Sequence, residues 1–403
     1  MIPFSPPHID EKIVASVKEA LLSGWITTGP RTKKFENLIA QYCGIDKVLC
    51  VNSASAGLEL ILRWFGVKED DEVIMPAYTY AATANVVVHC GAKPIFVDSN
   101  SNDFNINVEA IAKAITPKTK VIMPVDIGGL PCDYNAINEL VNKENIKQLF
   151  QPQNKIQQQL GRILVLSDSA HSIGGTYYGN KTGALTDVSV FSFHAVKNLT
   201  TAEGGAICLN LPKSFSSEDI YKELNYKSLH GQTKDALSKM QIGNWEYDIV
   251  EAGYKCNMTD IVASIGLVEL ERYDNDTLVR RKQIFDAYSQ AFQNETWAEV
   301  PIYKEQHRCS SFHVYLLRIK NINETQRNAI IQNIFEQDVA VNVHFKPLPM
   351  MTFYKNAGYN IQDYPIAYDN YSREISLPVY YTLSDENLNI VIQAVKTAVA
   401  RVL

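Results

Sequence analysis

Short apolar runs alternate with amphipathic stretches between residues 48 and 210, and this alternation constrains the fold more than any other feature of the chain. Runs rich in β-branched residues and bounded by turn residues predict strands, and the stretches between them predict helices. Such an order indicates an α/β domain, with a largely parallel sheet covered on both faces. The predicted strands are 48–51, 72–75, 93–97, 120–124, 163–166, 188–193 and 206–209, and the first predicted helices between them are 56–65, 82–90 and 108–114.

After residue 253 the pattern changes. Apolar residues then recur at helical spacing, so we expect mostly long helix over residues 258–297. The later predicted elements are strands at 312–319 and 339–343 and a terminal helix at 386–402. A chain of 403 residues is long enough for two domains. We therefore predict a large domain over 1–270, which includes the N-terminal segment, and a smaller α+β domain over 271–403.

Composition excludes several classes of protein. Hydrophobic residues make up 46% of the chain and charged ones 20%, which is typical of a soluble globular protein. A net charge of −6 without clustered Lys and Arg argues against nucleic acid as a partner. No run of 18 apolar residues and no secretory leader is visible, so we expect a cytoplasmic protein without a membrane span. The seven cysteines form no CxxC pair and the eight histidines are scattered, so neither a disulfide framework nor a metal site is expected.

One segment differs from its surroundings. Residues 142–159 are polar and rich in glutamine, and they lie between a predicted helix and a predicted strand. We interpret them as a solvated surface insertion, with a functional lid as the alternative.

Two charged residues follow neighbouring predicted strands. Asp168 ends the strand that begins near residue 163, and Lys197 lies just beyond the strand at 188–193. Functional groups gather at the carboxyl ends of parallel strands, so both side chains can reach one crevice. A lysine amine and a carboxylate in this arrangement suit pyridoxal phosphate, because the amine forms a Schiff base and the carboxylate keeps the pyridine nitrogen protonated. Taken singly, the aspartate also fits a helix cap and the lysine a surface position.

Residues 52–57 (NSASAG) follow the first strand and offer backbone N–H groups and hydroxyls to a phosphate. Ser53 or Ser55 can donate there, and Ser192 can supply another hydroxyl. Tyr80 can stack on a cofactor ring, and His171 can contact the ring or its substituents. The alternatives are a simple N-cap for the serines and core packing for Tyr80.

These features lie within longer motifs, and over nearly its whole length the sequence resembles the DegT family of nucleotide-sugar aminotransferases. Its most specific segment is SFHAVKNLTTAEGGAI at 192–207. Further matching segments are SGWITTGPRTKKFENLIAQYCG at 23–44, VNSASAGLELIL at 51–62, EVIMPAYTYAATANVVVHCGAKPIFVD at 72–98, SDSAHSIGGTYYGNKTG at 167–183 and GYKCNMTDIVASIGLVELE at 253–271. The resemblance implies the PLP-dependent transferase fold type I, with a mixed, mostly parallel seven-stranded sheet and a smaller C-terminal α+β domain.

The resemblance also implies roles for individual residues. Lys197 matches the lysine that binds the cofactor aldehyde. The implied cofactor-binding residues are Asp168 at the pyridine nitrogen, Tyr80 and His171 at the ring, and Ala54, Ser55, Ser192 and Asn257 at the phosphate. Asn257 would reach the phosphate of a neighbouring subunit in a homodimer. Many members have GxNxR at this place, whereas Lys255 and Asn257 stand here.

The reaction implied is a transamination with glutamate as amino donor and a nucleotide-linked keto sugar as acceptor. Agreement with the GYKxN and FHAxKNLTxAEGG variants favours a UDP-linked 4-keto-6-deoxy sugar, used for cell-surface glycans such as lipopolysaccharide. A 3-keto sugar and a dTDP or GDP carrier stay open. The residues that we expect to line the sugar cleft are Trp25, Thr28, His344 and Lys346, with dimer packing as the alternative.

Three other functions compete with this interpretation. Related PLP- or PMP-dependent sugar dehydratases carry His at the lysine position, so Lys197 argues against that activity. A non-catalytic relative is opposed by the intact set of chemistry-bearing residues. A nucleotide-dependent dehydrogenase is opposed by the absence of GxGxxG after a strand, since Gly174-Gly175 and Gly204-Gly205 lack that spacing.

Overall fold

The computed structural model describes residues 1–234 and 246–403, and its central element is a seven-stranded sheet. The strands run in the order β1-β9-β8-β5-β4-β2-β3. Strand β9 is antiparallel to both of its neighbours and the other pairs are parallel, so the sheet is mixed and mostly parallel. All seven strands predicted for it are confirmed to within two residues at each end. They are β1 (Lys47–Val51), β2 (Glu72–Pro76), β3 (Lys93–Val97), β4 (Thr119–Ile122), β5 (Leu164–Asp168), β8 (Val188–Ser192) and β9 (Gly205–Leu209).

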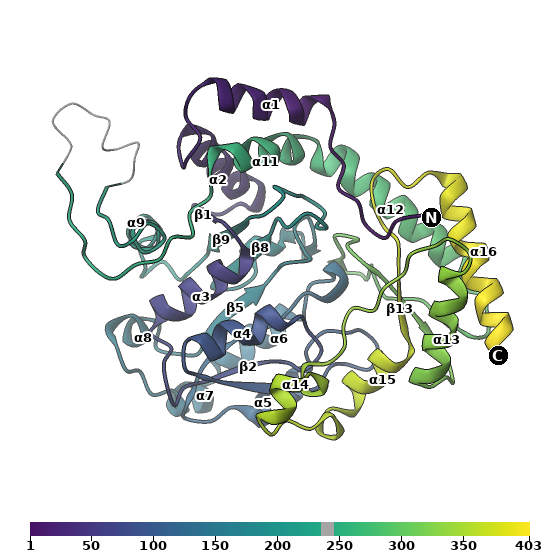
Figure 1. The fold of residues 1–403 in the computed structure, drawn as a ribbon. Helices are drawn as coiled ribbons and strands as arrows, with labels where there is room; N and C mark the ends of the chain where they lie inside the picture. The colour runs from purple at the N-terminus through teal and green to yellow at the C-terminus, as the bar shows by residue number, and fades with distance from the viewer. Residues whose placement is uncertain (235–245) are drawn as a thin grey trace.

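Both faces of this sheet are buried, because side chains alternate between two apolar cores. Leu49 and Val51 of β1 enter one core, and Val48 and Cys50 enter the other. Helices cover both sides, with α1 packed along α11 at one edge (Figure 1). The helices before residue 275 are α1 (Glu11–Leu22), α2 (Pro30–Cys43), α3 (Ala54–Phe65), α4 (Ala81–His89), α5 (Val108–Ala114), α6 (Tyr134–Asn142), α7 (Glu144–Leu149), α8 (Lys155–Leu160), α9 (Ser217–Lys227) and α11 (Asp260–Arg272).

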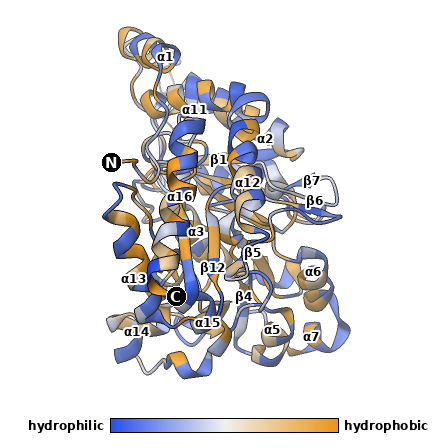
Figure 2. Cartoon of the chain, turned by 90° about the vertical axis from the view of Figure 1, so that its right-hand side faces the viewer, coloured by the Kyte–Doolittle hydropathy of each residue, from blue (hydrophilic) through white to orange (hydrophobic). Residues whose placement is uncertain are grey.

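The C-terminal part has its own core around a three-stranded sheet of order β10-β12-β13. The helix predicted over 258–297 is present as α11 and α12, but a π-helical turn at Tyr273–Thr277 separates them. Figure 2 shows α13 and α16 with hydrophobic and hydrophilic residues interspersed, as expected for helices that cover a core on one side. The elements here are α12 (Leu278–Phe292), β10 (Ala298–Glu299), β12 (Tyr315–Ile319), α13 (Glu324–Phe335), α14 (Thr352–Asn356), α15 (Pro365–Arg373), β13 (Glu374–Leu377) and α16 (Asp385–Val402).

The N-terminal residues also contact this second core. Ile2 is buried in it, and its backbone pairs with the segment at Val339. A third small sheet, of β6 (Thr176–Tyr177), β7 (Asn180–Lys181) and β11 (Arg308–Cys309), links the two parts of the chain. The division into domains at residue 270 stays a prediction. Among the described residues, no helix is long and apolar enough to cross a membrane.

One strand prediction is wrong. Residues 339–343 form no strand, because their backbone makes only isolated bridges, at Val339 and Asn342. Residues 142–159, which we interpreted as a solvated surface insertion, are mostly exposed; they contain α7 and α8, and a few of their side chains pack against the large core. The side-chain amide of Gln157 is fully buried and donates to the carbonyl of Phe65 at 2.9 Å. This glutamine satisfies the carboxyl end of α3 from within the protein.

Candidate active site

The ends of β5 and β8 open into one cavity of 380 Å³. Asp168 is the last residue of β5, and Lys197 follows β8 by five residues. The chain therefore brings these two side chains together in the way that a parallel arrangement of the two strands predicts. The predicted site residues that line the cavity are Ala54, Ser55, Tyr80, Asp168, His171, Ser192, Lys197 and His344.

Asp168 is a buried carboxylate with few partners. Its side chain is 5% exposed, and it accepts hydrogen bonds from Thr83 Oγ1 at 2.8 Å and from the backbone N–H of Ala170 at 3.2 Å. Burial raises the pKa of Asp168, although both hydrogen bonds and the nearby Lys197 favour the ionised form. A cationic group in the cavity would therefore be stabilised by this carboxylate.

Lys197 presents an amine with an unusual charge state. Burial lowers its pKa to about 8, and the attraction of Asp168 offsets only part of this effect. A substantial fraction of the amine is then neutral near physiological pH. A neutral lysine amine is a nucleophile and a base, so the site can form a bond to an aldehyde and can move a proton.

The start of α3 forms one wall of the cavity. Ser53 caps this helix by accepting a hydrogen bond from Ala56 N at 3.1 Å. Strand β9 approaches the helix so closely that a Cβ on Gly205 would lie 2.6 Å from Ala54 N. The backbone N–H groups in the first turn of α3 lie beside Ser55 and Ser192. A helix start of this kind makes a site for an anion such as a phosphate. The helix begins at Ala54, two residues earlier than predicted.

Aromatic and imidazole rings form another wall. The ring of His171 lies nearly parallel to that of Phe345, with centroids 5.6 Å apart and an interplanar angle of 27°. Its Nδ1 is buried and has no hydrogen-bond partner among the residues that the structure describes, and burial lowers the pKa of His171 well below its usual value. Tyr80 is 63% exposed, so the alternative of core packing is excluded for it. Its ring centroid lies 6.0 Å from that of Phe345.

His313 lines the cavity as well, and the sequence analysis missed it. Its Nδ1 lies 2.8 Å from Asn198 Oδ1. The preceding Phe312 has a φ of 57°, a conformation that costs energy for a bulky residue. Arg281 stabilises it by donating to the carbonyls of Phe312 and His313 at 2.9 and 2.7 Å. A single histidine within an apolar run carries no pattern that could have identified it.

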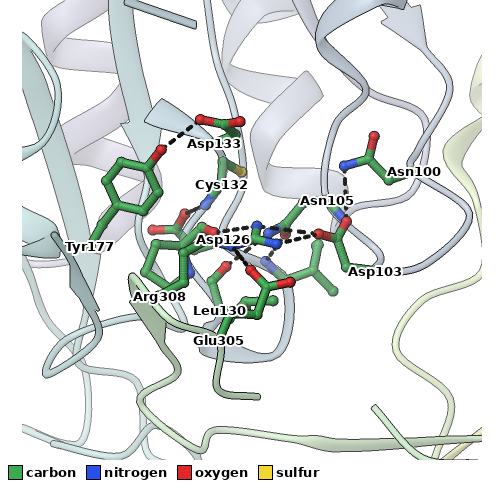
Figure 3. Close-up of polar contacts among 12 residues, drawn as sticks. Asn100, Asp103, Asn105, Asp126, Leu130, Cys132, Asp133, Tyr177, Glu305 and Arg308 are labelled. Atoms are coloured by element: carbon green, nitrogen blue, oxygen red, sulfur yellow. Dashed lines mark hydrogen bonds and ion pairs between the residues drawn. The ribbon is translucent and has the colours of Figure 1, made fainter. Parts of the chain in front are cut away.

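A buried polar network connects the loops that follow β4 and β5, which carry the cavity residues Val125 and His171. Asp126 accepts hydrogen bonds from Ser172 Oγ and Tyr134 OH, both at 2.6 Å, and from Cys132 N at 2.9 Å. Figure 3 shows the contact between Asp126 and Cys132, and also Arg308, which pairs with Asp103 at 3.3 Å. Burial raises the pKa of Asp126. The contacts of Asp126 fix the loops that follow β4 and β5, and the ion pair of Arg308 joins β11 to the loop that follows β3.

Four predicted residues do not line this cavity. Trp25 donates from Nε1 to the carbonyl of Thr28 at 3.1 Å, and Thr28 Oγ1 donates to the carbonyl of Met258 at 2.5 Å. Asn257 donates from Nδ2 to Thr28 Oγ1 at 2.6 Å. Lys346 is exposed. Within one copy of the chain, Thr28 therefore connects Trp25 with the segment at 257–258, whereas Lys346 faces solvent.

Comparison with known proteins gives a consistent result. A profile of the DegT/DnrJ/EryC1/StrS aminotransferase family matches residues 7–396. Spr1654 from Streptococcus pneumoniae, assigned as a sugar aminotransferase and solved in its PMP form, is 46% identical, with a TM-score of 0.96 and full coverage of both chains. It has also been solved in a PLP form. Protein MJ1066 of Methanocaldococcus jannaschii is 39% identical over 98% of this chain and 96% of its own. The spore coat polysaccharide biosynthesis protein SpsC of Bacillus subtilis is 34% identical over 99% of this chain and 97% of its own.

Proposed function

Since the chain belongs to the DegT/DnrJ/EryC1/StrS aminotransferase family, we propose that it is a pyridoxal 5′-phosphate-dependent sugar aminotransferase of the fold type I class. Its amino donor is glutamate and its acceptor is a nucleotide-linked keto sugar. The product serves cell-surface glycan synthesis, and the reaction takes place in the cytoplasm. The meeting of Asp168 and Lys197 in one cavity carries this proposal, and the PLP and PMP forms of Spr1654 support it.

The residues at the cavity fit the cofactor. The unpaired, buried Nδ1 of His171 is a polar atom that needs a partner, and a substituted pyridine ring offers one. Asp168 is a buried carboxylate whose partners are a hydroxyl and one backbone N–H, and it suits a protonated ring nitrogen. The start of α3 with Ser55 and Ser192 suits the phosphate, and exposed Tyr80 can cover a ring face.

When bound, pyridoxal phosphate supplies an electron sink for the pair left behind as a substrate C–H bond breaks. Asp168 strengthens that sink by holding positive charge at the ring nitrogen. With this group bound, Lys197 Nζ would accept the proton from the substrate carbon and later donate it again, which a pKa of about 8 permits. The apolar side chains of Phe345 and Val379 limit water at the cavity and so favour the neutral amine.

The acceptor that we propose first is a UDP-linked 4-keto-6-deoxy sugar. The test is an amino-transfer assay with labelled glutamate against 4-keto and 3-keto sugars on UDP, dTDP and GDP carriers, with Lys197→Ala as control. Label in the UDP 4-keto product, absent with the variant, is the expected result. Transfer to a different sugar or carrier would show that the acceptor differs from the one proposed. Transfer to none of them would refute the proposed aminotransferase activity.

We also propose a homodimer. A second cavity, of 570 Å³, shares Ser53, Ser55 and Tyr80 with the first, and Lys255 also lines it. A second copy that covers this open region would complete the phosphate site and bring Asn257 toward its neighbour. Sedimentation of the purified protein should show a dimer, and a fully active monomer would refute this arrangement.

A further inference from the structure

Three hydrogen-bonded side chains lead from the cavity into the protein interior. His344 lines the cavity, and its Nδ1 lies 2.9 Å from Ser376 Oγ. Ser376 Oγ lies 2.6 Å from Glu374 Oε1. Ser376 and Glu374 belong to β13, and both are fully buried. The chain of contacts therefore begins at the substrate side and ends at a carboxyl group without access to solvent.

The position of His344 is determined on several sides. Its backbone N–H donates to Glu374 Oε2 and to Ser376 Oγ, both at 3.1 Å. Its carbonyl accepts a hydrogen bond from the hydroxyl of Tyr78. Its ring lies nearly parallel to that of Phe4, with centroids 5.5 Å apart. The ring is thus held with Nδ1 toward Ser376, which leaves Nε2 for the cavity.

Two proton arrangements satisfy all of these contacts. When Glu374 is ionised, Ser376 donates to it and accepts from His344 Nδ1–H, so Nε2 carries no proton. When Glu374 is protonated, it donates to Ser376, which donates to Nδ1, and Nε2 carries the proton. The two arrangements differ by one proton and by the direction of two hydrogen bonds.

We propose that His344, Ser376 and Glu374 form a proton relay, in which a proton taken up at His344 Nε2 from the cavity is stored on Glu374. Uptake at Nε2 moves the Nδ1 proton to Ser376 and the Ser376 proton to Glu374, and release reverses each transfer. Nothing else is oxidised, reduced or bonded. The use of the relay in catalysis rests on the proposed function, whereas the coupling itself belongs to the protein.

Burial and the neighbouring charges set the pKa values of Glu374 and His344, the two ends of the relay. Burial raises the pKa of Glu374 to about 8, against the effects of Arg327 on α13 and Arg318 on β12. Burial, together with nearby Lys197, lowers the pKa of His344 to about 4, so its ring is neutral near pH 7. Burial, together with the positive charge of nearby Lys197, likewise lowers the pKa values of the cavity imidazoles, His171 and His313.

A sugar aminotransferase has a use for such a group. When nitrogen replaces the keto oxygen, the C–O bond breaks and the oxygen leaves as water, which requires a proton. His344 Nε2–H can give that proton, and Glu374 then becomes a carboxylate with Ser376 donating to it. In the reverse direction the relay takes the proton back.

The test is the ring-nitrogen spectrum of histidine-labelled protein, recorded over a pH range that spans 8, without substrate. The protein has eight histidines, and His344→Asn identifies the signals of interest. We expect the proton of His344 to be on Nε2 at the acidic end and on Nδ1 at the alkaline end. Glu374→Gln should abolish this change. Ser376→Ala, which interrupts the chain without touching the carboxyl, should abolish it as well and covers the case in which the first variant does not fold.

Glu36→Gln is the matched control, because Glu36 is also buried and burial raises its pKa, but it contacts Cys50 and Tyr221 rather than the relay. This variant should keep the change of tautomer. One unchanging tautomer in the parent protein, or a change that survives in both relay variants, would overturn the proposal. A protein that shows the change but transfers no amino group would refute the proposed function and leave the relay in place. In an active enzyme, Glu374→Gln should slow transfer to the sugar about 10²-fold.

Discussion

The substitution Gly205→Ala, which adds one methyl group, tests the proposed phosphate site at the start of α3. A Cβ there would lie 2.6 Å from Ala54 N, 2.7 Å from Ser53 C and 2.9 Å from Ala54 Cα. All three are backbone atoms, so neither a rotamer change nor a flexible side chain can relieve the contact. We therefore expect Gly205→Ala to cost about 3 kcal/mol of folding free energy, near the upper end for overpacking.

The same substitution should weaken cofactor binding. Moving the start of α3 away from β9 displaces the free N–H groups by several tenths of an ångström. Loss of one charge-assisted hydrogen bond costs about 1.5–3 kcal/mol, which raises the dissociation constant of pyridoxal phosphate about 10–150-fold. Urea unfolding measures the first effect, and titration of cofactor-free protein measures the second.

Gly179→Ala is the control for this experiment. Gly179 lies on the turn between β6 and β7 with a φ of 79°, and a Cβ there would meet no atom within 4 Å. It should lower stability by about 1–2 kcal/mol through backbone strain and leave cofactor affinity unchanged. Unchanged affinity in Gly205→Ala, in a protein that still folds, would refute the role given to the start of α3.

Three further predictions follow from the site. Asp168→Asn should lower kcat about 10²–10³-fold with little change in the urea midpoint, and near-normal turnover would contradict its place at the ring nitrogen. Only the neutral amine of Lys197 is nucleophilic, and burial lowers its pKa to about 8. Stopped-flow capture of added pyridoxal phosphate should therefore speed up as pH rises toward 8 and level off above it. A flat pH profile would count against Lys197 as the nucleophile. Arg281→Lys should cost about 3 kcal/mol in urea unfolding, because lysine cannot donate to the carbonyls of Phe312 and His313 in the same geometry.

The sheet could be predicted because its signal is local. Each buried strand, such as β5 or β8, is a short, largely apolar run, and the positions of Asp168 and Lys197 follow from the ends of these two runs. The antiparallel direction of β9 has no such signal, since a strand buried on both faces looks alike in either direction. Residues 339–343 resemble a strand for the same reason, yet their neighbours leave them only single bridges.

The rest of the site is assembled from distant segments. Thr83 reaches Asp168 across 85 residues, and Glu374 reaches His344 across 30, so no spacing in the sequence connects them. His313 enters the cavity because Asn198 and Arg281 hold it there, and neither contact has a periodic signature. The residues that line the cavity and lie within sequence motifs could be predicted. The residues that position them depend on the tertiary structure.

The central claim is that Lys197 carries amino-transfer chemistry on pyridoxal phosphate beside Asp168. The most direct measurement is the absorbance spectrum of the purified protein with this cofactor, before and after addition of glutamate, with Lys197→Ala as control. We expect a band at the edge of the visible that gives way to a near-ultraviolet band with glutamate, and no such change in the variant. No cofactor band after incubation with pyridoxal phosphate, or the same change without Lys197, would contradict it.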